Sequence, residues 1–194
     1  MKLYFAPGAC SLADHIALHE AGMSFEHEKV DLKTKRTESG ADFSRINPKG
    51  YVPALVLDGG ELLSENIAIL DWIAQQAPAL QPGGALGRTH LLEALAYVST
   101  EVHKGFKPFF QGGSDDDKAK AGATIAKRLQ YLADIMQGDY LFGAALTVAD
   151  CYLFVMLLWS DKFGVTVPAS LVAFRDRMMA RPAVVTAMQH EGLR

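Results

Sequence analysis

The chain has 194 residues, of which 49% are hydrophobic and 21% are charged, and its formal net charge is -3. These values are typical of a globular protein that buries a core without disulfide staples. The small negative charge, and the lack of Lys and Arg runs interleaved with aromatic residues, argue against a nucleic-acid partner. The composition is still compatible with an acidic small ligand, because a few local cationic side chains suffice to bind one.

The two cysteines, Cys10 and Cys151, lie far apart in the sequence. A disulfide scaffold in a secreted protein usually has more cysteines, so we expect both thiols to be reduced and the protein to be cytoplasmic. The segment Met1–Pro7 lacks the apolar region of a signal peptide. The longest apolar run, near Tyr152–Trp159, is too short to span a bilayer, and we expect no membrane partner.

The first part of the chain predicts strands and helices in alternation. Short apolar segments bounded by Gly and Pro indicate strands, and apolar residues at three-to-four spacing indicate helices. In chain order these are a strand at Lys2–Phe5, a helix from Leu12 closed by Gly22, a strand at Phe25–Val30, a helical turn at Phe43–Ile46, a hairpin joining Pro53–Leu57 to Glu61–Leu63, and a helix capped by Ser64.

The second part of the chain predicts only helices. They are expected at Thr89–Lys104, at Lys118–Gln137, after a Thr147–Asp150 capping box, and at Leu171–Met179 and Ala183–Gln189 around Pro182. Two prolines and two glycines between residues 77 and 85 mark a linker. We therefore predict an α/β domain at 1–77, a linker at 78–85 and an all-α domain at 86–194.

Cys10 and Ser11 stand at the predicted start of the first helix. A helix N-terminus offers unpaired N–H groups and a partial positive charge, which stabilise a thiolate on Cys10 itself or on a ligand docked there. The alternative is a small buried hydrophobe followed by an ordinary N-cap. The segment Cys10–Ala13 holds no second cysteine, which argues against disulfide exchange by a dithiol motif.

Other candidate residues are ambiguous when each is taken alone. The bond before Pro53 could be cis and turn the backbone of Val52 toward an extended peptide, although the sequence by itself favours an ordinary trans proline. Glu65 could hold an ammonium group while the N–H groups at residue 66 hold a carboxylate, or it could simply favour the helix dipole. Three further candidates could be ordinary surface charges or structural groups: Lys35, His103 and Lys104. No metal-binding cluster, phosphate loop or serine triad is visible.

Several short motifs nevertheless follow one another in a definite order. They are Met1–Tyr4, Pro7–Leu12, Val30–Lys33, Asn47–Gly50, Val52–Leu55, Glu65, Glu101–Phe106 and Thr147–Asp150. With these motifs the chain resembles the bacterial beta-class glutathione transferases from end to end. The Pro-Gly-Ala-Cys-Ser and His-Lys-Gly-Phe segments are specific to that class, whereas Val-Pro-Ala-Leu is shared more widely among glutathione transferases.

The resemblance implies a thioredoxin-like βαβαββα domain followed by a C-terminal helical bundle, assembled as a homodimer. It also implies a cis bond before Pro53 and glutathione as co-substrate, with no metal. The site residues that it implies are Cys10, Ser11 and His103 as catalytic groups, and Cys10, Lys35, Val52, Pro53, Glu65, Asn66, Thr100, His103 and Lys104 as glutathione-binding groups. In that scheme Val52 pairs with the cysteinyl part, Glu65 and Asn66 hold the γ-glutamyl end, and Lys35 approaches the glycyl carboxylate.

Three positions depart from the family pattern. Phe5 stands where tyrosine is common, Ala96 stands where asparagine is common, and Asn66 stands where a small residue is common. The first two changes remove a polar group each, and the third adds bulk beside the expected γ-glutamyl contact.

The expected chemistry is attack of the glutathione thiolate on a small electrophile held between the two domains. A second route is a mixed disulfide between Cys10 and glutathione, which gives thiol–disulfide transfer. Two rival hypotheses remain: a non-catalytic binder of glutathione or apolar ligands on the same fold, and a glutaredoxin-like redox protein that works through one thiol.

Overall fold

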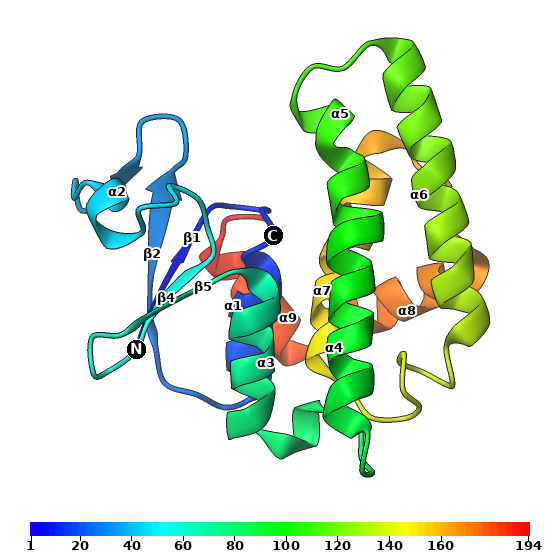
Figure 1. The fold of residues 1–194 in the computed structure, drawn as a ribbon, viewed down its shortest axis with the longest axis horizontal. Helices are drawn as coiled ribbons and strands as arrows, with labels where there is room; N and C mark the ends of the chain where they lie inside the picture. Colours follow the sequence, from blue (N-terminus) through cyan, green and yellow to red (C-terminus); the bar gives the residue numbers. More distant parts are fainter.

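The computed structural model describes residues 1–194. A small sheet and its helices form one part of the molecule, and long helices form the other (Figure 1). The first part has the element order β1 Lys2–Phe5, α1 Leu12–Glu20, β2 Glu26–Asp31, β3 Arg36–Thr37, α2 Phe43–Ile46, β4 Ala54–Val56, β5 Leu62–Ser64 and α3 Asn66–Gln76. This arrangement confirms the predicted thioredoxin-like α/β unit.

The sheet has five strands in the order β3-β2-β1-β4-β5. The central strand β1 pairs in parallel with β2 and antiparallel with β4, and the remaining pairs are antiparallel. Helices α1 and α3 lie between the sheet and the long helices, while α2 lies on the opposite side of the sheet (Figure 1). The two-residue strand β3 was not predicted, because Asp31–Gly40 is too polar to show a strand pattern.

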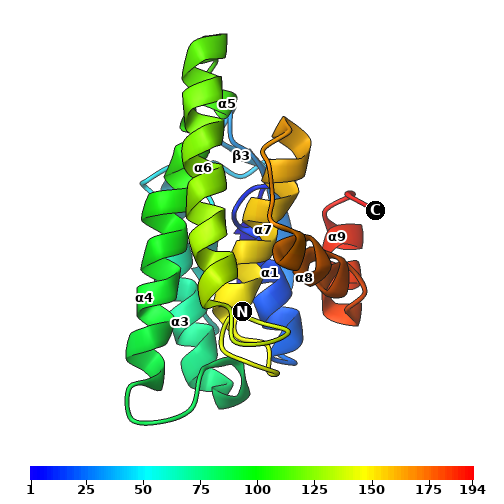
Figure 2. The ribbon, with the colours of Figure 1, turned by 90° about the vertical axis from the view of Figure 1, so that its right-hand side faces the viewer.

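The second part contains helices only. They are η1 Pro78–Leu80, α4 Gly87–Tyr97, η2 Val98–Val102, η3 His103–Phe106, α5 Lys107–Phe110, α6 Asp115–Ile135, α7 Val148–Phe163, α8 Ala169–Met179 and α9 Pro182–His190. Helix α7 runs through the middle, beside α1, with α8 and α9 beyond it (Figure 2). No helix has both the length and the apolar character needed to cross a membrane.

The predicted helix at Thr89–Lys104 changes its hydrogen-bond pattern along its length. It is an α-helix to Tyr97, a π-helical turn over Val98–Val102 and a 3₁₀ turn over His103–Phe106. Such π segments are frequent at functional sites. Gly105 lets this region approach α6, since a Cβ at Gly105 would lie 2.8 Å from Ile125 Cγ1.

Two helix starts test the predicted caps. The Thr147 capping box is confirmed: Asp150 Oδ2 accepts from both the backbone N–H and the hydroxyl of Thr147, and its Oδ1 accepts from the Leu141 N–H. The N-cap assigned to Ser64 is wrong, because Ser64 is the last residue of β5. Glu65 is the N-cap of α3 instead, with φ of 77° and no side-chain capping bond.

The loop that precedes α1 is held by side chains from the far end of the chain. Gly8 has φ of 67°, a left-handed conformation that glycine adopts at little cost. Its N–H donates to Glu191 Oε2 at 2.9 Å, and its carbonyl accepts from Trp159 Nε1 at 2.8 Å. We call this pair of contacts the Gly8 clamp, and it joins the two parts of the molecule directly next to Cys10.

Glu191 also contacts His15 of α1, with 3.0 Å between Oε1 and Nδ1. Burial raises the pKa of Glu191 to about 8 and lowers the pKa of His15 to about 4. At neutral pH the contact is therefore a hydrogen bond between two uncharged groups rather than an ion pair. A core of 40 buried residues continues through both parts of the molecule around these contacts.

Replacing Glu191 by alanine should destabilise the fold by about 2–5 kcal/mol, because the part-buried Gly8 N–H and the buried His15 Nδ1 both lose their partner. Glu191→Gln is the matched control and should cost less than about 1 kcal/mol, since an amide still accepts from one group and donates to the other. Urea unfolding measures both values. Equal losses in the two variants would contradict this account of the clamp.

Candidate functional site

A cleft of about 850 Å³ opens where the two parts of the molecule meet. Its volume falls within the range of small-molecule sites. Its walls come from the loops around residues 10, 32 and 52, from the start of α3, and from the α4–η3 region and α7. The lining residues are Cys10, Leu32, Tyr51, Val52, Pro53, Glu65, Asn66, Ile67, Ala68, Asp71, Leu92, Ser99, His103, Lys104, Gln111 and Tyr152.

Cys10 reaches this cleft from the turn that leads into α1. Its Sγ lies 3.8 Å from the carbonyl oxygen of Val52, a long contact in which the thiol is the donor. Burial raises the pKa of Cys10 to about 12, and hydrogen bonds from the Cys10 and Ser11 N–H groups oppose that shift only in part. The structure therefore argues against a thiolate on Cys10 itself, which was one of the two alternatives for the helix N-terminus.

The Val52–Pro53 peptide bond is cis. This confirms what the resemblance implied and corrects the trans bond that the sequence alone favoured. Both residues line the cleft, on the segment that leads into β4. Val52 has no strand partner, since the β1–β4 pairing begins at Ala54, opposite Tyr4.

Glu65 forms a small polar cluster at the start of α3. Its Oε1 accepts from Lys49 Nζ at 2.5 Å and from the Tyr51 hydroxyl at 2.7 Å. These two donors lower the pKa of Glu65, so it is ionised at neutral pH. The carboxylate thus already holds one ammonium group, that of Lys49, which shows that the position suits a cation.

Asn66 is buried behind this cluster, and its amide Nδ2 donates to the carbonyl oxygen of Cys10 at 3.0 Å. The larger side chain at this position therefore braces the Cys10 loop against α3. Ser11 is also fully buried, and its Oγ accepts from the Ala6 N–H at 3.3 Å. Ser11 does not line the cleft.

His103 lies on the opposite wall, where Nδ1 and the Tyr152 hydroxyl share a hydrogen bond of 2.6 Å. Its ring packs edge-on against Trp159, the residue of the Gly8 clamp. Burial, together with the neighbouring Lys104, lowers the pKa of His103 to about 4. His103 is therefore a neutral imidazole at pH 7, able to accept or donate one hydrogen bond.

Of the predicted glutathione-binding residues, two do not line the cleft. Lys35 has φ of 57°, and its Nζ donates to the carbonyl oxygen of Gly50 at 2.7 Å, next to Tyr51. Thr100 is exposed, and its hydroxyl donates back to the Ala96 carbonyl in its own helix. The remaining ones are brought together: Cys10, Val52, Pro53, Glu65, Asn66, His103 and Lys104.

The other two departures from the family pattern lie outside the cleft. Phe5 is buried against the rings of His15 and His27. Ala96 does not line the cleft either. Tyr51 and Tyr152, which were not predicted as site residues, complete the contacts of Glu65 and His103. Tyr51 could have been found, because it directly precedes the Val52–Pro53 pair. Tyr152 lies in the apolar run Tyr152–Trp159, where nothing in the sequence distinguishes it.

A thioredoxin-like domain with a cis-proline and a cysteine just before its first helix, followed by helices that close a shared cleft, defines the class of fold. The family models for the N-terminal and C-terminal domains of glutathione S-transferase match residues 9–76 and 95–182. Glutathione S-transferase GstA of Escherichia coli O157:H7 is 41% identical, with 100% of each chain covered.

Solved structures give the same result. A sphingomonad glutathione S-transferase complexed with glutathione is 47% identical, with a TM-score of 0.92 and 100% of both chains covered. The beta-class glutathione S-transferase of Sphingomonas chungbukensis is 44% identical, with a TM-score of 0.91 over 100% of both chains. The chain belongs to the glutathione S-transferase family, as its motifs predicted.

The raised pKa of Cys10 predicts how fast the free protein is alkylated. The rate constant with iodoacetamide should rise about tenfold for each pH unit between pH 7 and 9.5, because the thiolate fraction keeps growing over that range. Free glutathione is the control and should level off as pH passes its ordinary thiol pKa of about 8.5. Mass spectrometry follows the modification, and Cys10→Ala should stay unmodified because Cys151 is buried. A rate that is already constant at pH 7–8 would contradict the buried, neutral thiol.

Proposed function

We propose that this protein is an enzyme that conjugates the thiolate of glutathione to small electrophiles. The observation that carries the proposal is the meeting of Cys10, Val52 and Glu65 on one wall of the cleft, with His103 and Lys104 opposite. The family membership supports it, and so does the similar sphingomonad enzyme, whose structure was solved as a complex with glutathione. The cleft is lined about equally by hydrophobic and other residues, which suits a polar tripeptide beside an apolar second substrate.

In the proposed complex, glutathione lies extended along Val52, whose backbone has no strand partner. Its γ-glutamyl ammonium meets Glu65, while its carboxylate meets the N–H groups at the start of α3, where a helix has unpaired donors. The glycyl carboxylate is assigned to Lys35, which would leave its present contact with the Gly50 carbonyl. Thr100, His103 and Lys104 complete the site from the helical part.

The sulfur of glutathione then faces Cys10 at the front of α1. Lowering its thiol pKa by one unit requires about 1.4 kcal/mol of preference for the charged form. The Cys10 thiol and the N–H groups of the preceding turn supply donors for that purpose, with Ser11 acting through the position of the loop. The thiol proton leaves to solvent, the sulfur forms a bond to the electrophilic carbon, and the leaving group departs with the electron pair of its own bond.

Thiol–disulfide transfer through Cys10 is the second candidate reaction. There the Cys10 thiolate attacks the disulfide of an oxidised substrate, a Cys10–substrate bond forms, and the released thiolate takes up a proton. A thiol with a pKa near 12 supplies little thiolate at neutral pH, so this reaction should be the slower one. The homodimer implied by the resemblance and the cytoplasmic location expected from the cysteine content belong to the same proposal. The two unbridged cysteines fit the proposed location.

Calorimetry tests the binding half of the proposal. The wild-type protein should take up one glutathione per chain, and Glu65→Gln should weaken binding about tenfold or more, because a charge-assisted contact to the γ-glutamyl ammonium becomes a neutral one. Glu61→Gln, at an exposed position of the hairpin that precedes α3, is the matched control and should bind normally. Absence of heat from glutathione with the folded wild-type protein would refute the assignment.

Cys10→Ala separates the two reactions. Conjugation of 1-chloro-2,4-dinitrobenzene should fall by no more than about tenfold, the worth of one neutral hydrogen bond, because the sulfur of glutathione performs the attack. Reduction of hydroxyethyl disulfide should disappear. Saturable glutathione binding without turnover in either assay, in the wild-type protein, would instead favour the non-catalytic binder.

A further inference from the structure

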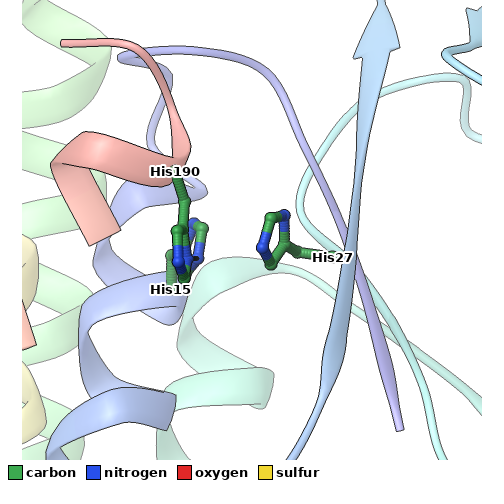
Figure 3. Close-up of side chains that lie close together, drawn as sticks. All are labelled: His15, His27 and His190. Carbon is green, nitrogen blue, oxygen red and sulfur yellow. Dashed lines mark hydrogen bonds between the residues drawn. The ribbon is translucent and has the colours of Figure 1, made fainter. Parts of the chain in front are cut away.

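A group of histidines lies away from the cleft, on the side of the sheet part where the chain ends. His15 comes from α1, His27 from β2, and His190 is the last residue of α9. Figure 3 shows their imidazoles gathered between these three elements, with His15 and His190 together and His27 facing them from the strand. None of the three lines the cleft, so the proposed function leaves them unused.

One ring nitrogen of each histidine lies within 4.8 Å of a ring nitrogen of the other two. His190 Nδ1 and His15 Nε2 lie 3.4 Å apart. The rings of His27 and His190 are stacked with 4.4 Å between centroids. Two of the three side chains, those of His27 and His190, are exposed, while His15 is fully buried. The group is thus a fixed buried imidazole with two solvent-accessible ones in front of it.

The ring of the buried histidine, His15, is oriented by a hydrogen bond to Glu191. His15 Nδ1 lies 3.0 Å from Glu191 Oε1, and the other oxygen of that carboxyl accepts from the Gly8 N–H. When a cation binds, the His15 proton lies on Nδ1 and is donated to an ionised Glu191, so that Nε2, which now lies 3.4 Å from His190 Nδ1, presents its lone pair to the metal. A carboxylate behind a metal-bound histidine is the usual outer arrangement of such sites, where it fixes both the tautomer and the ring orientation.

We propose that His15, His27 and His190 form a binding site for one divalent transition-metal ion of the Zn²⁺ class. Three imidazole nitrogens with no carboxylate oxygen among the direct ligands favour zinc, nickel, cobalt or copper over magnesium or calcium. The fourth position is open to water, since two of the ligands face solvent. This proposal is independent of the activity assigned above.

The geometry requires a small rearrangement. Nitrogens bound tetrahedrally to zinc at 2.0–2.1 Å lie about 3.3 Å apart, so separations of up to 4.8 Å must shorten. Rotation of the exposed His27 and His190 side chains accomplishes this, since exposed rotamers exchange within nanoseconds.

A cation bound there would link three segments that are distant in the sequence. It would join β2 and α1 of the first part to the end of α9, and its charge would favour the ionised form of Glu191, which is uncharged at neutral pH without the cation. An ionised carboxylate is a stronger acceptor for the Gly8 N–H than a neutral carboxyl. Because the unfolded chain does not hold these histidines together, metal binding should stabilise the fold.

The test uses the full-length chain without an affinity tag, freed of metal by chelator and dialysed. Wild-type protein should bind one Zn²⁺ per chain in equilibrium dialysis, and Co²⁺ should give the visible absorption of an imidazole-bound tetrahedral ion. At one hundred times the dissociation constant, Zn²⁺ should raise the melting temperature by about 5 °C or more. His27→Asn and His190→Asn, both at exposed positions where folding should be unaffected, should each weaken binding by about tenfold or more and abolish the shift.

His90→Asn is the matched control, since His90 is an exposed histidine on α4 outside the group. It should bind Zn²⁺ as the wild-type protein does. The proposal is overturned by a wild-type protein that binds no stoichiometric metal, or by His27→Asn and His190→Asn variants with unchanged affinity. It is equally overturned if the bound metal disappears on Cys10→Ser but not on His190→Asn, because the thiol would then be the ligand.

Discussion

The arrangement of the cleft depends on how the loop before α1 is held. Gly8 offers one backbone N–H and one carbonyl, and the helical part satisfies both, through Glu191 and Trp159. Buried backbone groups are costly to leave unpaired, so this loop keeps its conformation only while the two parts of the molecule stay docked. Asn66 adds a third brace by donating to the Cys10 carbonyl. The position of the Cys10 sulfur is thus set by residues from α3, α7 and the end of α9.

The same docking determines the charges around the cleft. Cys10 and His103 are both buried enough to be neutral at pH 7, so neither wall supplies a thiolate or an imidazolium of its own. In the first part, Glu65 is ionised and two donors stabilise it at the rim. A cleft of this kind has neutral donors where a sulfur would arrive and a carboxylate where an ammonium would arrive. That division of charge argues for glutathione as the source of the thiolate and against a nucleophile from the chain itself.

Local sequence patterns predicted most of the helices and strands, whereas the cis peptide bond, one helix cap and one cleft residue depend on tertiary contacts. Apolar spacing indicated the central strands and the long helices, and the Thr147 capping box was visible because its residues are three apart. The cis bond before Pro53 came only from the family resemblance, since cis and trans prolines have the same sequence signature. Ser64 was misplaced because a good capping residue also fits the end of a strand, where pairing with Ala54 holds it. Tyr152 stayed hidden among the apolar residues of α7.

The histidine group shows most clearly what a sequence conceals. Residues 15, 27 and 190 have no spacing typical of a metal motif, because the ligands come from a helix, a strand and the end of the chain. Only the return of α9 onto α1 brings them together. Glu191 then serves two neighbours, the Gly8 N–H on one oxygen and His15 on the other. Anything that changes the charge on this carboxyl must alter its hold on the Gly8 loop, so the histidines and the Cys10 loop are connected through a single side chain.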